Sequence, residues 1–158
     1  MIITGAASGI GRAALQLLAE AGARVYAVDR DSSGLDSLLA QLPGGPDRHV
    51  GRVVDLADTQ TLEPMVADAV AAFGGIRALI NVAALLRRES IEDVSAQSWD
   101  QHVDVNLKAT FFLCRAAAAA MTASGGGGRI VNFTARPGRS DRFTAAMCMW
   151  RPRRVSSR

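Results

Sequence analysis

Three glycines near the amino terminus, at positions 5, 9 and 11, have the spacing of a phosphate-binding turn. The β-branched pair Ile2–Ile3 before them predicts a short strand, and the apolar pattern over residues 12–20 predicts a helix. Glycines let the backbone turn tightly against a ligand, and a helix start offers free N–H groups and a positive dipole end. The order of strand, turn and helix therefore predicts a diphosphate site. Its candidate residues are Thr4, Gly5, Ser8, Gly9, Ile10 and Gly11.

An acidic residue ends the next predicted strand, residues 24–29, as a dinucleotide site requires. The Asp29 carboxylate can accept both ribose hydroxyls of an adenosine and repels a 2′-phosphate, so it favours NAD over NADP. The neighbouring guanidinium of Arg30 could instead pair with a 2′-phosphate, which keeps NADP as the less favoured cofactor. Asp29 could also cap the following helix, although Asp31 and Ser32 are better placed for that role.

Strand and helix patterns alternate along the chain. Further strands are predicted at residues 49–55, 76–82 and 129–134, and further helices at 33–42, 59–73 and 95–122. Such alternation is typical of a Rossmann-type doubly wound parallel sheet, here with strand order 3-2-1-4-5 and no strand after the fifth. His49, at a strand start, is expected at the surface.

Three motifs resemble the short-chain dehydrogenase/reductase family, from residue 1 to about residue 134. They are Thr4-Gly5-x-x-x-Gly9-x-Gly11, the Asn81-Val82-Ala83-Ala84 run and the Trp99-Asp100 pair followed by Asn106-Leu107. The family's usual Asn-Asn-Ala-Gly differs from the second motif at two of four positions. The resemblance implies a dinucleotide cofactor and hydride transfer between NAD(P) and an alcohol or carbonyl substrate. It also implies a homo-oligomer, an assembly that the shortened fold makes doubtful.

The resemblance also implies roles for individual residues. Asp55, with Leu56 after it, would hold the adenine ring, although Asp55 could equally be a strand-end residue that starts a turn. Asn81 would brace the central sheet, and the small Ala83 would leave room for the cofactor. Asn106 would interrupt its helix and hold a water in a proton relay, or it is a solvated surface residue.

The other catalytic residues of the family are absent. Its serine after the fifth strand is replaced by Ala135, and no Tyr-x-x-x-Lys follows. The chain has one tyrosine, Tyr26 in the second strand, and one lysine, Lys108 in the long helix. The sequence therefore predicts a catalytically incompetent relative of an oxidoreductase. The alternatives are a non-catalytic NAD-binding fragment and an unfolded product of a damaged gene.

Residues 136–158 differ in composition from the rest of the chain. They hold seven of the 18 basic residues and one acid, and they show no helix or strand periodicity. Read from the third base of each codon, the codons of residues 147–153 permit Tyr-Val-Ala-Ser-Lys, with the tyrosine codon beginning in Cys148. We therefore predict a dinucleotide-binding domain over residues 1–135 and an irregular, frameshifted basic tail over 136–158, with a genuine basic arm as the alternative.

Composition limits the remaining possibilities. The 158 residues are 49% hydrophobic and 5% aromatic, which suits one aliphatic α/β domain. The net charge of +3 comes from the tail, so it does not indicate nucleic-acid binding. No apolar run is long enough for a membrane span, and two cysteines are too few for a metal site or disulfide framework. These features favour a cytoplasmic protein with a small-molecule substrate that the sequence does not identify.

Overall fold

The computed structural model describes residues 1–45, 48–87, 89–136 and 144–150. Its centre is a six-stranded sheet with the order β3-β2-β1-β4-β5-β6, in which the first five strands are parallel. The strands are β1 (Ile2–Thr4), β2 (Val25–Asp29), β3 (His49–Val53), β4 (Ala78–Asn81), β5 (Arg129–Arg136) and β6 (Thr144–Trp150). The predicted doubly wound sheet with order 3-2-1-4-5 is confirmed.

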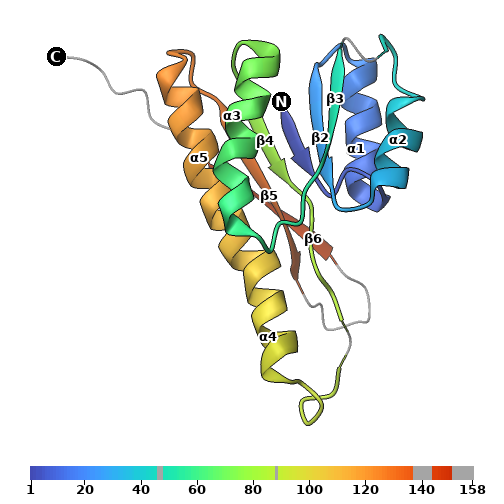
Figure 1. Ribbon diagram of the computed structural model, residues 1–158, viewed down its shortest axis with the longest axis vertical. Helices are drawn as coiled ribbons and strands as arrows, with labels where there is room; N and C mark the ends of the chain where they lie inside the picture. Colours follow the sequence, from blue (N-terminus) through green and yellow to red (C-terminus); the bar gives the residue numbers. More distant parts are fainter. Residues whose placement is uncertain (46–47, 88, 137–143, 151–158) are drawn as a thin grey trace, which may run out of the picture.

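Helices cover both faces of this sheet (Figure 1). They are α1 (Gly9–Glu20), α2 (Ser32–Leu39), η1 (Thr59–Thr61), α3 (Leu62–Phe73), α4 (Ala96–Val103), η2 (Asp104–Lys108) and α5 (Ala109–Ala123). The short η1 turn precedes α3, so the predicted helix over 59–73 begins with a tighter turn.

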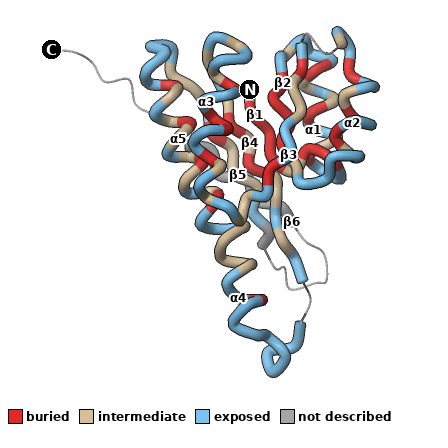
Figure 2. Tube along the Cα trace, viewed as in Figure 1, coloured by how far each residue is buried: buried red, intermediate tan, exposed pale blue. Residues whose placement is uncertain are grey.

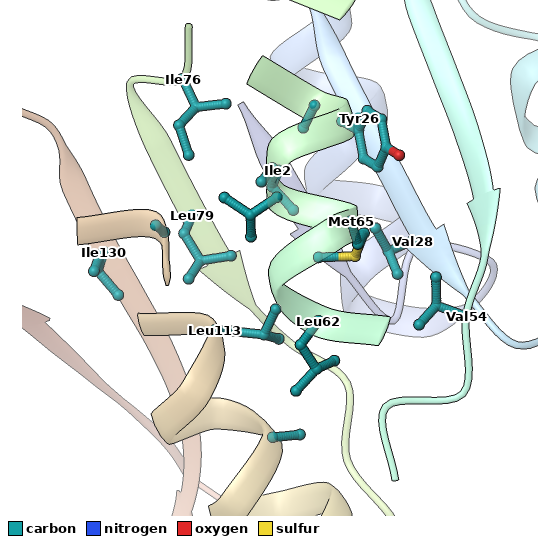
Figure 3. Packing of buried hydrophobic residues seen from close by; sticks show 14 of the residues in the cluster. Ile2, Tyr26, Val28, Val54, Leu62, Met65, Ile76, Leu79, Leu113 and Ile130 are labelled. Carbon is teal, nitrogen blue, oxygen red and sulfur yellow. The ribbon is translucent and has the colours of Figure 1, made fainter. Parts of the chain in front are cut away.

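Each face of the sheet has its own hydrophobic core. On one face α1 and α2 pack through Leu15, Leu35 and Leu38 against the side of β1 and β2 that carries Ile3 and Ala27. On the other face α3 and α5 pack against the opposite side of the strands, as Figure 3 shows for ten labelled residues. Alternate strand residues point to opposite faces, so Ile2 and Ile3 belong to different cores.

The end of the chain differs from the sequence prediction. Residues 144–150 were expected to be irregular, but they form β6, which pairs antiparallel with β5 from Ile130↔Trp150 to Arg136↔Thr144. The expectation that β5 is an unprotected sheet edge is therefore wrong, because β6 satisfies its outer hydrogen-bonding groups. The other predicted tail residues, 137–143 and 151–158, lie outside the described part of the chain.

The prediction for His49 is also wrong. Its side chain is buried, and its Nε2 lies 2.9 Å from the carbonyl oxygen of Pro43. The contact with Pro43, which follows α2, joins residues that charge and periodicity did not bring together.

The predicted long helix is formed by α4, η2 and α5, which follow one another without a gap. Its central part, η2, is a π-helix that contains Asn106, so the α-helical hydrogen-bond pattern is interrupted at this residue, as expected. Beyond the sheet, α4 and the chain that leads into it extend away from the core, and most of their residues are exposed (Figure 2).

Candidate functional site

A cavity of about 380 Å³ lies at the carboxyl ends of the parallel strands. Ten of the twelve cofactor-binding residues predicted from the sequence line it, namely Gly5, Ser8, Gly9, Ile10, Gly11, Asp29, Arg30, Asp55, Leu56 and Ala83. They come from the segments that follow β1, β2, β3 and β4, which the parallel sheet brings to one edge. This edge, where the strand order changes direction at β1 and β4, is where doubly wound sheets bind ligands.

Two of the glycines in the first turn are required by close contacts. Gly5 has a φ of 69°, and a Cβ there would lie 2.8 Å from the backbone nitrogen of Ala83. A Cβ on Gly11 would overlap the carbonyl oxygen of Gly5. The turn after β1 is therefore packed against both the start of α1 and the segment after β4, and no larger residue fits.

The Asp29 carboxylate is held by two backbone N–H groups. Its Oδ2 accepts from the nitrogen of Ala7 at 2.9 Å, and its Oδ1 accepts from the nitrogen of Asp31 at 3.1 Å. The first bond ties the end of β2 to the glycine turn. Each oxygen keeps a second lone pair, and the residue lines the cavity, so the carboxylate can also accept from a ligand.

Asp31 has the capping role that was the alternative for Asp29. It is the N-cap of α2, and its Oδ1 accepts from the nitrogen of Gly34 at 3.0 Å. This bond, together with one from the Ser33 hydroxyl, lowers the pKa of the Asp31 carboxyl. The capping role for Asp29 is therefore wrong.

Thr4 and Asn81 are buried and do not line the cavity. The Thr4 hydroxyl accepts from the nitrogens of Val82 at 3.2 Å and Ala83 at 3.3 Å, so it fixes the segment after β4 to the end of β1. The Asn81 amide donates to the Asn132 Oδ1 at 2.8 Å across β4 and β5. Both residues therefore hold the strand ends that border the cavity without lining it.

Cys114 lies beside this pair of asparagines. Its sulfur is 3.5 Å from the Nδ2 of Asn81 and 3.7 Å from the Oδ1 of Asn132. Burial raises the pKa of the thiol, and the bonds to the two asparagines lower it by less. The thiol of this partly buried residue is therefore protonated at neutral pH.

Asn106 binds the main chain of a single residue. Its Oδ1 accepts from the nitrogen of Leu85 at 2.7 Å, and its Nδ2 donates to the oxygen of Leu85 at 2.8 Å. Leu85 lines the cavity, as does Val105 next to Asn106. The side chain thus joins the π-helical turn to the cavity wall.

Six residues that line the cavity are not among those predicted from the sequence. They are Val28, Val54, Val82, Ala84, Leu85 and Val105. The first four are neighbours in sequence of Asp29, Asp55 and Ala83, so adjacency to a predicted site residue was a usable signal. Val105 comes from a helix distant in sequence, and no local pattern indicates it.

The single tyrosine and the single lysine lie away from the cavity lining. The Tyr26 ring is 1% exposed, in the core between β2 and α3, and its hydroxyl accepts from the Nε of Arg52 at 3.2 Å. Lys108 pairs with Asp104 at 3.1 Å on the exposed surface of η2.

A parallel sheet with a glycine turn and acidic strand ends at one cavity defines an α/β nucleotide-binding protein. The sequence model of the short chain dehydrogenase family matches residues 1–147. The chain belongs to this family, whose members are oxidoreductases that bind NAD or NADP.

Individual relatives agree with this assignment. The chain is 43% identical over 136 residues to the D-threitol dehydrogenase of Mycolicibacterium smegmatis, covering 85% of this chain and 52% of the relative. It is 34% identical over 135 residues to the NAD-dependent glycerol dehydrogenase of Listeria innocua, with the same coverage. The chain spans about half the length of the curated relatives that it matches.

Solved structures of the family have the same fold. A short chain dehydrogenase of Bacillus anthracis superposes with a TM-score of 0.78 at 29% identity, over 83% of this chain and 53% of that one. A short-chain dehydrogenase/reductase of Brucella melitensis superposes with a TM-score of 0.71 at 34% identity, over 75% and 50%. Among the described residues no helix is long and apolar enough to cross a bilayer, and no cluster of potential metal ligands occurs.

Proposed function

We propose that this chain binds NAD in the cavity at the ends of β1 to β4 and does not catalyse hydride transfer. The observation that supports binding is the Asp29 carboxylate, held by two backbone N–H groups while it borders the cavity beside the glycine turn. A fixed carboxylate at this position selects a ribose with free hydroxyls.

The cavity suggests how the dinucleotide would lie. The adenosine would occupy the end near Asp29 and Asp55, with its diphosphate on the Gly9–Gly11 helix start. Since β4 lies on the opposite side of β1 from β2 and β3, the nicotinamide would extend towards Leu85 and Val105.

The preference for NAD depends on Asp29 and Arg30. Arg30 is exposed and lines the cavity, so its guanidinium is free to turn towards a phosphate or towards solvent. Asp29 has no such freedom, because its two bonds fix its position. A 2′-phosphate would therefore meet a fixed negative charge, and we expect NAD to bind more tightly than NADP.

The proposed lack of turnover has a separate basis. When bound, the nicotinamide ring supplies the hydride acceptor or donor, but proton transfer to the substrate oxygen needs an acid or base from the chain. Tyr26 is in the core and Lys108 is paired with Asp104, so neither reaches the cavity. Asn106 alone has no titratable proton.

Calorimetric titration with NAD and NADP tests the proposal. We expect heat of binding with NAD and at least about tenfold weaker binding of NADP, since hydrogen bonds to a charged group contribute about 1.5–3 kcal/mol. Asp29→Asn should remove this preference. Asp31→Asn, two residues away and outside the cavity lining, is the matched control and should keep it. Absence of heat with either dinucleotide, or tighter binding of NADP, would contradict the proposal.

The same samples test turnover. D-Threitol and glycerol are the appropriate substrates, because two relatives are dehydrogenases for these polyols. We expect no formation of NADH above that of the substrate and NAD without protein. Formation of NADH at the rate of a full-length relative would show that another group supplies the proton transfer.

A further inference from the structure

Three side chains on the long helix, Ser98, His102 and Asn106, contact the segment that follows the cavity wall. Asn106 binds the main chain of Leu85 through both of its side-chain atoms. The Nε2 of His102 lies 3.2 Å from the backbone nitrogen of Arg87, and the Ser98 hydroxyl donates to the carboxylate of Glu89. We call these three contacts the polar zipper.

The register of the polar zipper follows from the geometry of its two sides. On the helix the three residues are four apart, which is a rise of about 6 Å per step. On the opposite segment the three partners are two residues apart in the sequence. Figure 1 shows the chain from β4 running beside the long helix before it turns back into α4.

We propose that His102 is a positioning residue that holds the Leu85 wall of the cavity against the long helix only while its ring is neutral. The backbone nitrogen of Arg87 can only donate, so Nε2 must be the acceptor. The ring proton is then on Nδ1, which lies 2.8 Å from the carbonyl oxygen of Ser98 and donates to it. Both ring nitrogens are thus satisfied in one tautomer.

Protonation removes the acceptor in the middle of the polar zipper. With both nitrogens carrying hydrogen, Nε2–H would face the N–H of Arg87, and the contact would become repulsive. Histidine is the side chain whose ordinary titration lies between about pH 5 and 8. Mild acid should therefore separate Arg87 from the helix and leave Leu85 held by Asn106 alone.

Charged groups lie on both sides of the polar zipper. On the segment these are Arg87 and Glu89, and both are exposed. On the helix, Asp100 is exposed and Asp104 is paired with Lys108. The pH dependence that we propose comes from the hydrogen bonds of the His102 ring.

Amide hydrogen exchange measured by NMR between pH 5.5 and 8 tests this inference without any ligand. The protection factor of the Arg87 amide should fall roughly three- to tenfold as the pH is lowered, which is the value of one hydrogen bond. The Val82 amide is the internal control, because it donates to the Thr4 hydroxyl at 3.2 Å and has no titratable partner. Its protection factor should stay constant.

The variant His102→Gln keeps an acceptor that does not titrate, and it should remove the pH dependence at Arg87. Constant protection of Arg87 in the unchanged protein would overturn the proposal, as would a pH dependence that persists in His102→Gln. Equal loss at Arg87 and Val82 would indicate general unfolding and would also overturn it. Because the unchanged protein alone gives these outcomes, the test does not depend on the variant folding.

A second readout rests on the proposed function. NAD, which would reach Leu85, should bind roughly three- to tenfold more weakly at pH 5.5 than at pH 8, whereas adenosine, which ends before Leu85 and has no group that titrates in this range, should not change. A chain that binds neither ligand would contradict the proposed function. The role of His102 would then be tested by the amide hydrogen exchange of Arg87 alone. NAD binding that is independent of pH would overturn the positioning role.

Discussion

Two aspartates of the same loop, Asp29 and Asp31, show how position determines the role of a carboxylate. Both accept backbone hydrogen bonds, but Asp29 binds the glycine turn and borders the cavity, whereas Asp31 caps α2 at the exposed surface. The bonds to Gly34 and Ser33 lower the pKa of Asp31, so the cap is present at neutral pH and is lost as the pH falls through the folded pKa.

Gly5 gives a prediction at the same scale. The substitution Gly5→Ala would force a non-glycine residue to a φ of 69° and bring its Cβ within 2.8 Å of the Ala83 nitrogen. Gly22→Ala is the matched control, since Gly22 has a φ of 87° and open space around it. The backbone strain alone costs about 1–2 kcal/mol.

We therefore expect Gly22→Ala to lower the free energy of unfolding by about 1 kcal/mol and Gly5→Ala by more than about 2 kcal/mol. Urea denaturation followed by circular dichroism measures both. Equal losses of unfolding free energy for the two variants would contradict this prediction, because the close contact with Ala83 would then have no effect on stability.

At the scale of elements, the strands β4 and β5 are joined by more than their backbone ladder. Asn81 and Asn132 are register partners, and their side chains are hydrogen-bonded to each other above the sheet. The Oδ1 of Asn81 is buried without a partner among the described residues, so its amide is satisfied through Nδ2 alone, which donates to Asn132 and, at 3.5 Å, to the Cys114 sulfur.

A double-mutant cycle on Asn81→Ala and Asn132→Ala tests this bridge. Each single change should cost about 1–3 kcal/mol of unfolding free energy, because the remaining amide is left unsatisfied, and the two should be coupled by about 1 kcal/mol or more. The control cycle uses Arg52 and Asp68, an exposed ion pair whose side chains are 51% and 50% exposed. It should show coupling below about 1 kcal/mol. Additive losses at the asparagines would contradict the bridge.

Most of the helices and strands, and most of the cavity lining, were predictable from the sequence. Period-two and period-3.6 patterns predicted β1 to β5 and the helices between them, because each element buries one face in a two-sided core. The glycine and acidic motifs predicted most of the cavity lining, since parallel strands bring their carboxyl ends together. Val105, the burial of His49 and the polar zipper were not predictable, because each depends on contacts between segments that are distant in the sequence.

At the scale of the whole molecule, the end of the chain differs most from expectation. The pairing of β6 with β5 is antiparallel, in a sheet whose other pairs are all parallel. Antiparallel pairing uses backbone N–H and C=O groups, which every segment has. The presence of β6 therefore does not show that its side chains were selected for this sheet. It is therefore compatible with a segment that was not selected for this fold.

The gene sequence tests the proposed frameshift directly. We expect the nucleotides that encode residues 133–158 to contain, in a second reading frame, Tyr-x-x-x-Lys with its tyrosine codon beginning in Cys148. Sequencing this region of the gene gives the answer. If neither other frame contains this motif, the frameshift is wrong, and the seven arginines of residues 136–158 become a genuine basic arm whose acidic partner should be sought.

The central place of β1 has a consequence for synthesis on the ribosome. β1 leaves the ribosome before both of its neighbours in the sheet, β2 and β4, and Ile2 lies opposite Leu79. At a synthesis rate of about 5–20 residues per second, β1 waits for roughly 4–15 seconds before its second neighbour emerges. During that interval one edge of this wholly buried strand can pair with nascent chains on neighbouring ribosomes of the same mRNA. Slower translation before residue 79 should therefore increase aggregation.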